Sequence, residues 1–228
     1  MKQELNILLG KAVAFLFYGA FLAALVGLVF IDVHWLHNFV HETSLTEVAQ
    51  ELLLLAIAGG FFAAAWRQAE RRSAWMLVGG FFLCMLIREM DFAFDALWHG
   101  AWVWFALAIA LVCLWHAARH IAATVRGLAD FVTHPGYGMM CAGLLCILVF
   151  SRLFGMSALW QTLMLDGYNR VVKNMVEEGC ELLGYGLCLL ATLSYMKTVL
   201  RRMTRKREGG ALFIRNNFSD TIRLAECG

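Results

Sequence analysis

Charged residues and proline are both scarce in this chain of 228 residues. Only 16% of the residues are Asp, Glu, Lys or Arg, and Pro135 is the single proline. Hydrophobic residues make up 61% of the chain and the mean hydropathy is +0.67. A water-soluble domain of this size has too little interior to bury so much apolar surface. The composition therefore excludes soluble, nucleic-acid-binding and disordered classes and indicates a polytopic membrane protein.

Motifs that would identify a reaction are also absent. The seven cysteines include no Cys-x-x-Cys pair, so neither a disulfide framework nor a thiolate zinc site is expected. The chain has no glycine-rich phosphate loop, no Gly-x-Ser-x-Gly turn and no His-Glu-x-x-His motif. The chemistry must therefore be inferred from where the ionisable residues lie along the chain.

Six stretches are long and apolar enough to cross the hydrocarbon core, which needs about 20 residues of helix. Helices are required because an isolated strand would leave its backbone polar groups unpaired in lipid. The predicted spans are residues 12–31, 47–66, 74–94, 100–118, 137–155 and 177–197. The sequence thus predicts an all-α fold: a bundle of six transmembrane helices within residues 1–207, followed by a short cytoplasmic tail, 208–228.

The distribution of basic residues predicts the direction of these spans, because cytoplasmic loops carry an excess of Lys and Arg. Fifteen of the 19 basic residues fall on one side: Lys2, Lys11, Arg67, Arg71, Arg72, Arg119, Arg126, Lys197, Arg201, Arg202, Arg205, Lys206, Arg207, Arg215 and Arg223. Both termini are therefore expected in the cytoplasm, in a bacterial-type inner membrane.

Tryptophans and small residues add two expectations about packing. Seven tryptophans fall near predicted span ends, as an aromatic belt requires: Trp66, Trp75 and Trp115 at the cytoplasmic ends, and Trp35, Trp98, Trp102 and Trp160 at the outer ends. Gly19, Ala23 and Gly27 repeat every four residues, a spacing that lets helices approach closely. We expect this stripe to pack within the bundle.

Acidic residues gather on the opposite, outer side. Glu51, Glu89 and Glu181 should lie about one to two helical turns inside the outer surface, in three different spans. Arg88 and Arg152 lie at similar depth, and neither arginine can lose its charge at accessible pH. Charged groups in a span normally face the bundle interior and find partners. We therefore expect one polar cluster with more carboxylates than arginines.

This cluster has both structural and chemical interpretations. Carboxylates held near like charges in a low dielectric suit general acid–base catalysis, which makes Glu51, Glu89 and Glu181 candidate catalytic groups. Arg88 and Arg152 would then bind an anionic head group or a developing oxyanion. The alternative is that these groups only hold helix ends together, and acids at the start of a helix also complement its dipole.

A divalent metal, such as zinc, is a further candidate cofactor. Asp91, Asp95 and His99 share one face of the third span, and His37 and His41 are four residues apart in the loop before the second span. Imidazole and carboxylate groups are suitable zinc ligands. The spacing is equally consistent with an amphipathic helix lying at the membrane surface.

Three functions remain open from the sequence. The first is a membrane-embedded enzyme, with or without a metal, that acts on a lipid or other amphiphilic substrate from the periplasmic leaflet. The second is a small transporter or channel subunit for protons or metal cations, with the same acids as relay groups. The third is a non-catalytic scaffold or sensor whose basic tail contacts a partner or anionic lipid. The enzyme is favoured because the polar groups collect on one side and form no path across the membrane.

Overall fold

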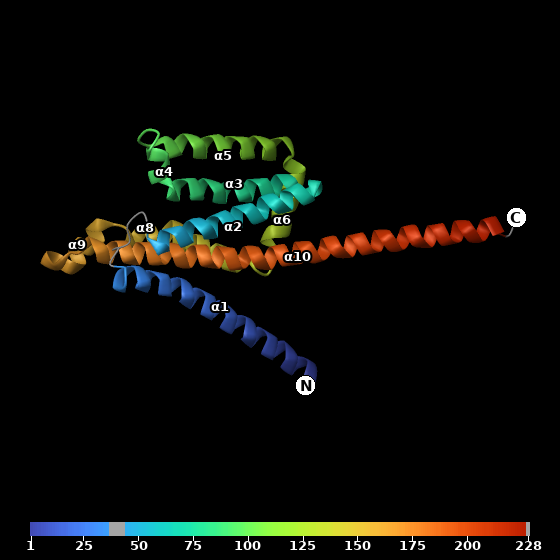
Figure 1. The fold of residues 1–228 in the computed structure, drawn as a ribbon, viewed down its shortest axis with the longest axis horizontal. Helices are drawn as coiled ribbons and strands as arrows, with labels where there is room; N and C mark the ends of the chain where they lie inside the picture. Colours follow the sequence, from blue (N-terminus) through green and yellow to red (C-terminus); the bar gives the residue numbers. More distant parts are fainter. Residues whose placement is uncertain (37–43, 227–228) are drawn as a thin grey trace. The chain divides into compact units, whose positions relative to one another are not determined.

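The computed structural model describes residues 1–36 and 44–226, with side chains described as far as residue 205. Within these ranges the chain is helical and contains no strand, which confirms the all-α prediction (Figure 1). The elements are α1 (Lys2–His34), α2 (Leu45–Arg67), η1 (Ala69–Arg71), α3 (Arg72–Glu89), α4 (Asp91–Asp95), α5 (Ala101–Arg119), α6 (Ile121–Val132), α7 (Tyr137–Leu145), η2 (Cys146–Phe150), α8 (Ser151–Phe154), α9 (Ser157–Met164), η3 (Leu165–Gly167) and α10 (Arg170–Glu226).

The chain divides into two compact units, Met1–Thr192 and Leu193–Gly228, and the division falls inside α10. Every predicted site residue that the structure describes lies in the first unit. The predicted boundary between a membrane domain and a tail at residue 207 stays a prediction.

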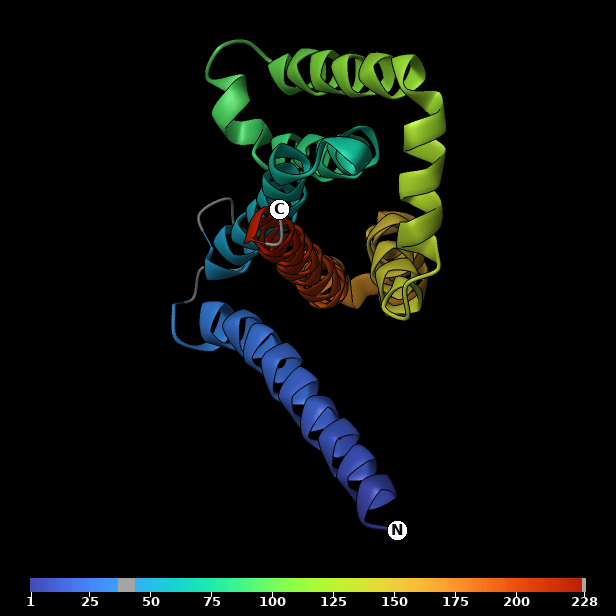
Figure 2. The same cartoon turned by 90° about the vertical axis from the view of Figure 1, so that its right-hand side faces the viewer.

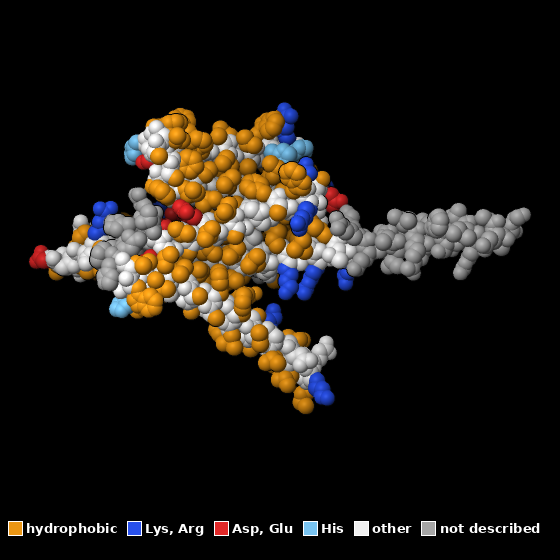
Figure 3. Space-filling view, in the orientation of Figure 1, with side chains coloured by type: hydrophobic (Ala, Val, Ile, Leu, Met, Phe, Trp, Pro, Cys, Tyr) orange, Lys and Arg blue, Asp and Glu red, His pale blue; other side chains and the backbone are white. Residues whose placement is uncertain are grey.

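Five helical stretches in the described part of the chain are long and apolar enough to cross a membrane. They are α1, α2, α5, Tyr137–Phe154 and Arg170–Arg205. Each overlaps one of the predicted spans. Hydrophobic side chains also cover most of the visible described surface, as contact with lipid requires (Figure 3). These features indicate a multi-pass membrane protein.

The predicted third span, residues 74–94, is not a single helix. α3 ends at Glu89, Met90 has φ −87° and ψ 24°, and the short helix α4 follows. The sequence extends the span too far because apolar residues such as Phe92 and Phe94 continue the hydrophobic run beyond the break. Hydropathy registers this run but not the change in backbone direction at Met90.

α3 lies at the centre of one packed layer. It contacts α2 on one side and α5 on the other, and Figure 1 shows the three helices running side by side. Phe61 of α2, with Trp75 and Phe82 of α3, fills the interior of this layer. Because lipid tails are as apolar as these side chains, close packing rather than exclusion of water holds such helices together.

Glycine allows a second close contact, between α7 and the first part of α10. A Cβ atom on Gly143 would lie 2.6 Å from the carbonyl oxygen of Gly184, and one on Gly184 would lie 2.5 Å from Cγ1 of Ile147. Only residues without a side chain permit this approach. The contact brings Ser151 and Arg152, which follow on α8, against α10.

The small-residue stripe of α1 does not pack as predicted. No other atom lies within 4 Å of a Cβ built on Gly19 or Gly27. α1 instead meets α10 through another face of the same stretch, where Leu22 and Leu25 approach Gly186. The spacing of small residues identified a helix surface suited to close contact, but Leu22 and Leu25 lie on the side that faces α10.

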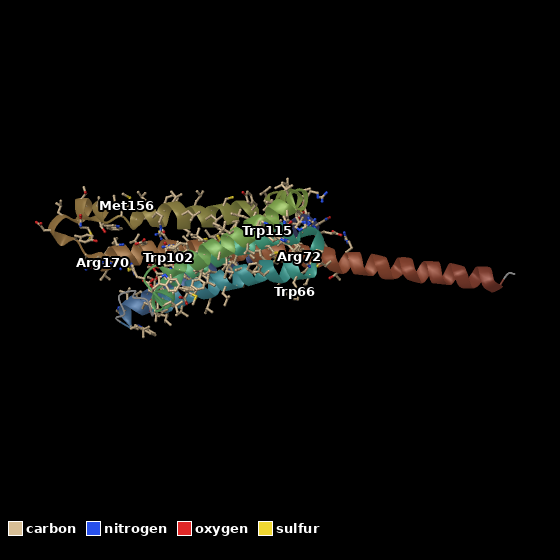
Figure 4. All side chains as sticks on the ribbon, turned by 90° about the horizontal axis from the view of Figure 1, so that it is seen from above. Trp66, Arg72, Trp102, Trp115, Met156 and Arg170 are labelled. Atoms are coloured by element: carbon tan, nitrogen blue, oxygen red, sulfur yellow. The ribbon has the colours of Figure 1, made fainter. Side chains whose placement is uncertain are left out.

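Tryptophans mark opposite ends of the first unit. Trp66 and Trp115 lie at one end, with Arg72 close by, whereas Trp102 lies at the other (Figure 4). Trp75 departs from the predicted belt because it is fully buried in the core between the helices. Its large ring fills interior space at the start of α3 and does not reach an interface.

α6 is an element that the sequence analysis does not identify. It runs across the ends of its neighbours and connects α5 to α7 (Figure 2). Arg71 and Asp130 form a salt bridge of 3.1 Å that ties it to η1, and Gly127 packs against Ala74 of α3. At 12 residues it is too short to cross a bilayer, so a pattern of apolar runs of about 20 residues does not reveal it.

Candidate functional site

Polar side chains meet at the end of the first unit that carries the C-terminus of α3 and the N-terminus of α2. Glu89 is the last residue of α3 and Gln50 lies in the second turn of α2. The first part of α10 contributes Glu178, Glu181 and Tyr185. We refer to Gln50, Glu51, Arg88, Glu89, Glu178 and Tyr185 as the Arg88 group, and to Ser151, Arg152, Lys173, Glu177 and Glu181 as the Arg152 group.

Glu89 is the centre of the Arg88 group. Its Oε1 atom accepts a hydrogen bond of 2.9 Å from Nη1 of Arg88 and another of 2.7 Å from the hydroxyl of Tyr185. Tyr185 is fully buried, whereas 41% of the Arg88 side chain is exposed. One carboxylate thus joins α3 to α10 and lies between a buried phenol and a guanidinium group that reaches the surface.

Gln50 and Glu178 form the second contact of this group. Nε2 of Gln50 donates to Oε2 of Glu178 at 3.0 Å and to its backbone oxygen at 3.2 Å. Glu178 also interacts electrostatically with Glu89 and Arg88. Because the amide donates twice to one residue, α2 is tied to α10 at the same depth as Glu89.

Glu51 completes the surplus of negative charge. It lies near enough to Glu89 for their carboxylates to repel each other. No hydrogen bond or ion pair to Glu51 is found among the described side chains. The Arg88 group, as defined above, therefore contains three carboxylates and a single cationic side chain.

In the Arg152 group, unlike the Arg88 group, the carboxylates are matched by cations. Glu181 is only 2% exposed, and its Oε1 atom accepts hydrogen bonds from Arg152 and from the hydroxyl of Ser151, the latter at 2.7 Å. Glu177 pairs with Lys173 at 2.8 Å and lies 3.7 Å from Arg152. Two carboxylates here meet two cations, so this group has no surplus charge.

A π-helical turn positions Ser151 and Arg152 of the Arg152 group. η2, Cys146–Phe150, is a π-helix that separates α7 from α8. Such turns insert one extra residue into a helix and often occur at functional sites. The Ser151 hydroxyl donates to Oε1 of Glu181 at 2.7 Å, and its oxygen also lies 3.0 Å from the backbone oxygen of Ile147. The turn thus directs two adjacent residues, Ser151 and Arg152, toward the same carboxylate of α10.

The two groups lie next to each other along α10 and adjoin through neighbouring residues. Glu177 belongs to one and Glu178 to the other, and their carboxylates interact electrostatically. All five predicted acid, base and anion-binding residues are therefore found at one end of the first unit. The structure divides them: Glu51, Arg88 and Glu89 lie in the group with surplus acid, and Arg152 and Glu181 pair with each other.

Asp32 is a buried carboxylate that the sequence analysis does not select. Oδ1 accepts the backbone N–H of Leu45 at 2.9 Å, and Oδ2 accepts both the N–H of Thr46 at 2.8 Å and its hydroxyl at 2.6 Å. These donors belong to the first turn of α2, where the helix dipole also favours negative charge. Asp32 therefore caps α2 from the end of α1, together with Ser44, the N-cap residue.

The predicted metal ligands are only partly assembled. Oδ2 of Asp95 lies 2.9 Å from Nδ1 of His99, and Oδ1 accepts the N–H of Gly100 at 2.8 Å. These bonds, that of Gly100 above all, lower the pKa of Asp95 below its usual range. Asp91 is exposed, and His37 and His41 lie outside the described residues. Among the residues that are described, no three His, Cys, Asp or Glu side chains are placed to hold a metal ion.

Uncharged partners are what the sequence analysis misses at this site. Gln50, Ser151 and Tyr185 carry no charge and belong to no motif, so nothing in the sequence separates them from other polar residues of the spans. Their spacing does hold one signal, because Tyr185 lies four residues after Glu181 and seven after Glu178 on α10. A helix places these three side chains on one face.

Comparison with known proteins supplies no family for this chain. No family model, curated protein or solved structure matches it. A function must therefore be argued from the site itself.

Proposed function

We propose that this chain is a membrane-embedded enzyme that acts on a lipid or other amphiphilic substrate by general acid–base catalysis. The observation that carries the proposal is the Arg88 group. Three carboxylates from three helices, Glu51, Glu89 and Glu178, gather near one partly exposed arginine and one buried tyrosine. Carboxylates crowded in this way compete for protons, and proton exchange is what acid–base catalysis requires.

The contacts suggest a role for each side chain of this group. Glu51 has no described donor, so its carboxylate is the candidate general base. Glu89 accepts hydrogen bonds from two donors, Arg88 and the Tyr185 hydroxyl, which hold its carboxylate in place. Arg88 has guanidinium N–H groups beyond the one that contacts Glu89 and would bind an anionic part of the substrate.

The Arg152 group has a positioning role in this proposal. Glu181 is buried and bound by Arg152 and Ser151, so its carboxylate has no free side toward a substrate. Its place on α10 one turn before Tyr185 instead fixes the rotation of that helix. We therefore assign the acid–base chemistry to Glu51 and Glu89.

The membrane arrangement is part of the proposal. We place the protein in a bacterial-type inner membrane, with six crossings and both termini in the cytoplasm. α3, which is third in chain order, would add one crossing to the five long apolar helices. Its 18 residues of helix are about 27 Å long, close to the thickness of the hydrocarbon core. Its Arg72 and Arg88 lie at its two ends, where long side chains reach the interface. The polar site would then open toward the periplasmic leaflet.

Proton or cation transport is the alternative that uses the same surplus of acid. A transport path needs polar groups at successive depths across the bilayer. Among the described residues of the first unit, however, the two buried carboxylates, Asp32 and Glu181, both lie at the end that carries the site. In the part of the chain that the structure describes, the fully buried side chains between the ends carry no charge: Leu54, Ile57 and Phe82 are apolar, and the Thr192 hydroxyl donates to the backbone oxygen of Cys188. This distribution supports catalysis over transport.

A comparison of membrane lipids tests the enzyme. We would express the wild-type protein and the variants Glu51→Gln and Glu89→Gln, and analyse the lipids by mass spectrometry. We expect one lipid species to fall and another to rise with the wild type alone. Asp166→Asn, which removes an exposed carboxylate from η3, is the matched control and should behave as wild type.

The opposite result would overturn this function. If all variants give the same lipid profile as wild type, the site is not catalytic toward lipids. A proton or cation current in liposomes that Glu51→Gln abolishes would then assign the chain to the transporter class. A phenotype that survives both substitutions but needs the basic tail would support the scaffold or sensor.

A further inference from the structure

Gln50 carries a buried oxygen atom without a partner. Its side chain is 1% exposed, and its Nε2 atom donates to two oxygen atoms of Glu178, which fixes the orientation of the amide. Oε1 is then the free end, and within the described residues it accepts no hydrogen bond. A buried acceptor left in this state is destabilising, because it has lost its bond to water and gained no other. A bound donor would remove that penalty.

The surroundings of this oxygen are negative. Gln50 joins the Arg88 group through Glu178, and Glu51, the next residue of α2, joins it through Glu89. Glu178 and Glu89 interact electrostatically with each other. The unpartnered oxygen therefore belongs to an amide that contacts a group of three carboxylates with one arginine, and a ligand that suits this place both donates hydrogen bonds and carries positive charge.

An ammonium group meets both requirements better than the simpler occupants. A water molecule would satisfy Gln50 but would leave the surplus charge, whereas a proton would reduce the charge and bring only one donor. The described residues provide no set of three metal-binding side chains. A primary ammonium has three N–H donors and one positive charge.

The setting indicates that this ammonium belongs to an amphiphile. The helices that carry the site are apolar enough to cross a membrane, and the site lies at their ends, where head groups are found. Arg88 is partly exposed and could bind an anionic group beside the ammonium. We propose that the Arg88 group binds the primary ammonium head group of an amphiphilic molecule, with Oε1 of Gln50 and the carboxylate of Glu51 as acceptors.

This assignment rests on the proposed function, because it names the substrate class of the same site. Two lipids that differ in the N–H donors of their head groups test the essential feature of this site. Phosphatidylethanolamine and phosphatidylcholine share charge and phosphate, but the first has three N–H donors and the second has none. A site built around the Gln50 oxygen should prefer the first. One charged hydrogen bond predicts a preference of about tenfold.

Native mass spectrometry of the full chain in nanodiscs measures this preference. The nanodiscs contain equal amounts of the two lipids with matched acyl chains, and the measured quantity is the ratio of the lipids bound. We expect a ratio near ten for wild type and near one for Gln50→Leu and for Glu51→Gln. Asp166→Asn should keep the wild-type ratio. Because the ratio is taken within each variant, a loss of protein stability that lowers the binding of both lipids equally leaves the ratio unchanged.

The outcomes separate this inference from the enzyme. An equal ratio in wild type, or a preference that survives both substitutions, overturns the ammonium site even if lipids are still converted. A strong preference without conversion supports the site and contradicts the enzyme. Soluble phosphoethanolamine, added to nanodiscs of phosphatidylcholine, tests whether the ammonium group comes from a free head group and not from a whole lipid. Binding of this compound that depends on Gln50 would assign the site to the free head group.

Discussion

Tyr185 donates its phenolic hydrogen to Oε1 of Glu89 across 2.7 Å, and the two residues are 96 positions apart in the sequence. The same oxygen accepts a hydrogen bond from Arg88, the residue before Glu89. This pair therefore joins the last turn of α3 to α10 through one atom. It also gives the candidate site a buried proton donor next to a surface-reaching cation.

Replacing the tyrosine tests the energy of this connection. Tyr185→Phe keeps the ring but removes the donor, and a hydrogen bond to a charged acceptor contributes about 1.5–3 kcal/mol. We expect the free energy of unfolding in mixed micelles to fall by this amount. Tyr18→Phe is the matched control, because Tyr18 contacts the ring of Phe17 and its hydroxyl has no hydrogen bond among the described residues. Equal stability of the two variants would contradict the assignment.

The sequence predicts the depth at which charged residues collect more reliably than it predicts which partner each charged side chain contacts. Glu51, Glu89 and Glu181 were placed at one end because hydrophobic runs fix the depth of each residue in its span. Depth does not determine rotation about the helix axis, which depends on packing such as that of Gly143 against Gly184. Hence the sequence could not show that Glu181 pairs with Arg152 while Glu51 has no such pair.

The break after α3 shows a second limit of the sequence. Arg88, Glu89 and Asp91 flank Met90, but Phe92 and Phe94 continue the hydrophobic run, so the average hydropathy does not register the helix end at Met90. The chain turns there for tertiary reasons, in the turn that brings Glu89 to Tyr185. The predicted helices of α2 and α5 needed no such information, because α2 begins at a Ser44 cap and α5 begins after Gly100.

The ion pair of Arg152 and Glu181 should respond unequally to the loss of either partner. Arg152→Met leaves a carboxylate that is 2% exposed without its cation, and breaking a buried pair in this way costs about 3–5 kcal/mol. Glu181→Gln leaves Arg152, whose side chain is 45% exposed and can turn to the interface, so about 1–2 kcal/mol is expected. Unfolding of both variants and of the double variant would measure the difference. Equal losses would contradict it.

Close packing of α7 on α10 gives a test with a control in the same helix. Gly143→Ala would place a Cβ atom 2.6 Å from the carbonyl oxygen of Gly184, so the helices must separate. We expect a loss of about 1–3 kcal/mol in the free energy of unfolding. Gly138→Ala has no atom within 4 Å of its new Cβ and should be neutral or slightly stabilising. If both variants lose stability equally, the contact is not the cause.

The turn at Asp95 predicts a pH dependence. Because its pKa is lowered in the folded state, Asp95 stabilises the turn above its unfolded pKa of about 3.9. This contribution is lost as the pH falls through the lower folded value. Carbon-13 NMR titration of the Asp95 carboxyl measures the pKa. His99→Ala should leave part of the lowering, since the Gly100 N–H is its largest single cause, and a return to the ordinary value would contradict this account.

Asp32 provides the sharpest test of how the first two helices are joined. Asp32→Ala would leave three donors of Leu45 and Thr46 without their acceptor, the fully buried Asp32 carboxylate, so we expect a loss of about 3–5 kcal/mol. Asp32→Asn keeps one carboxamide oxygen and should lose roughly half as much. Ser44→Ala, which removes the ordinary N-cap of the same helix, should cost only about 1 kcal/mol. Unfolding of the three variants in one micelle system gives the order. If Asp32→Ala proves no worse than Ser44→Ala, the carboxylate does not hold α1 to α2.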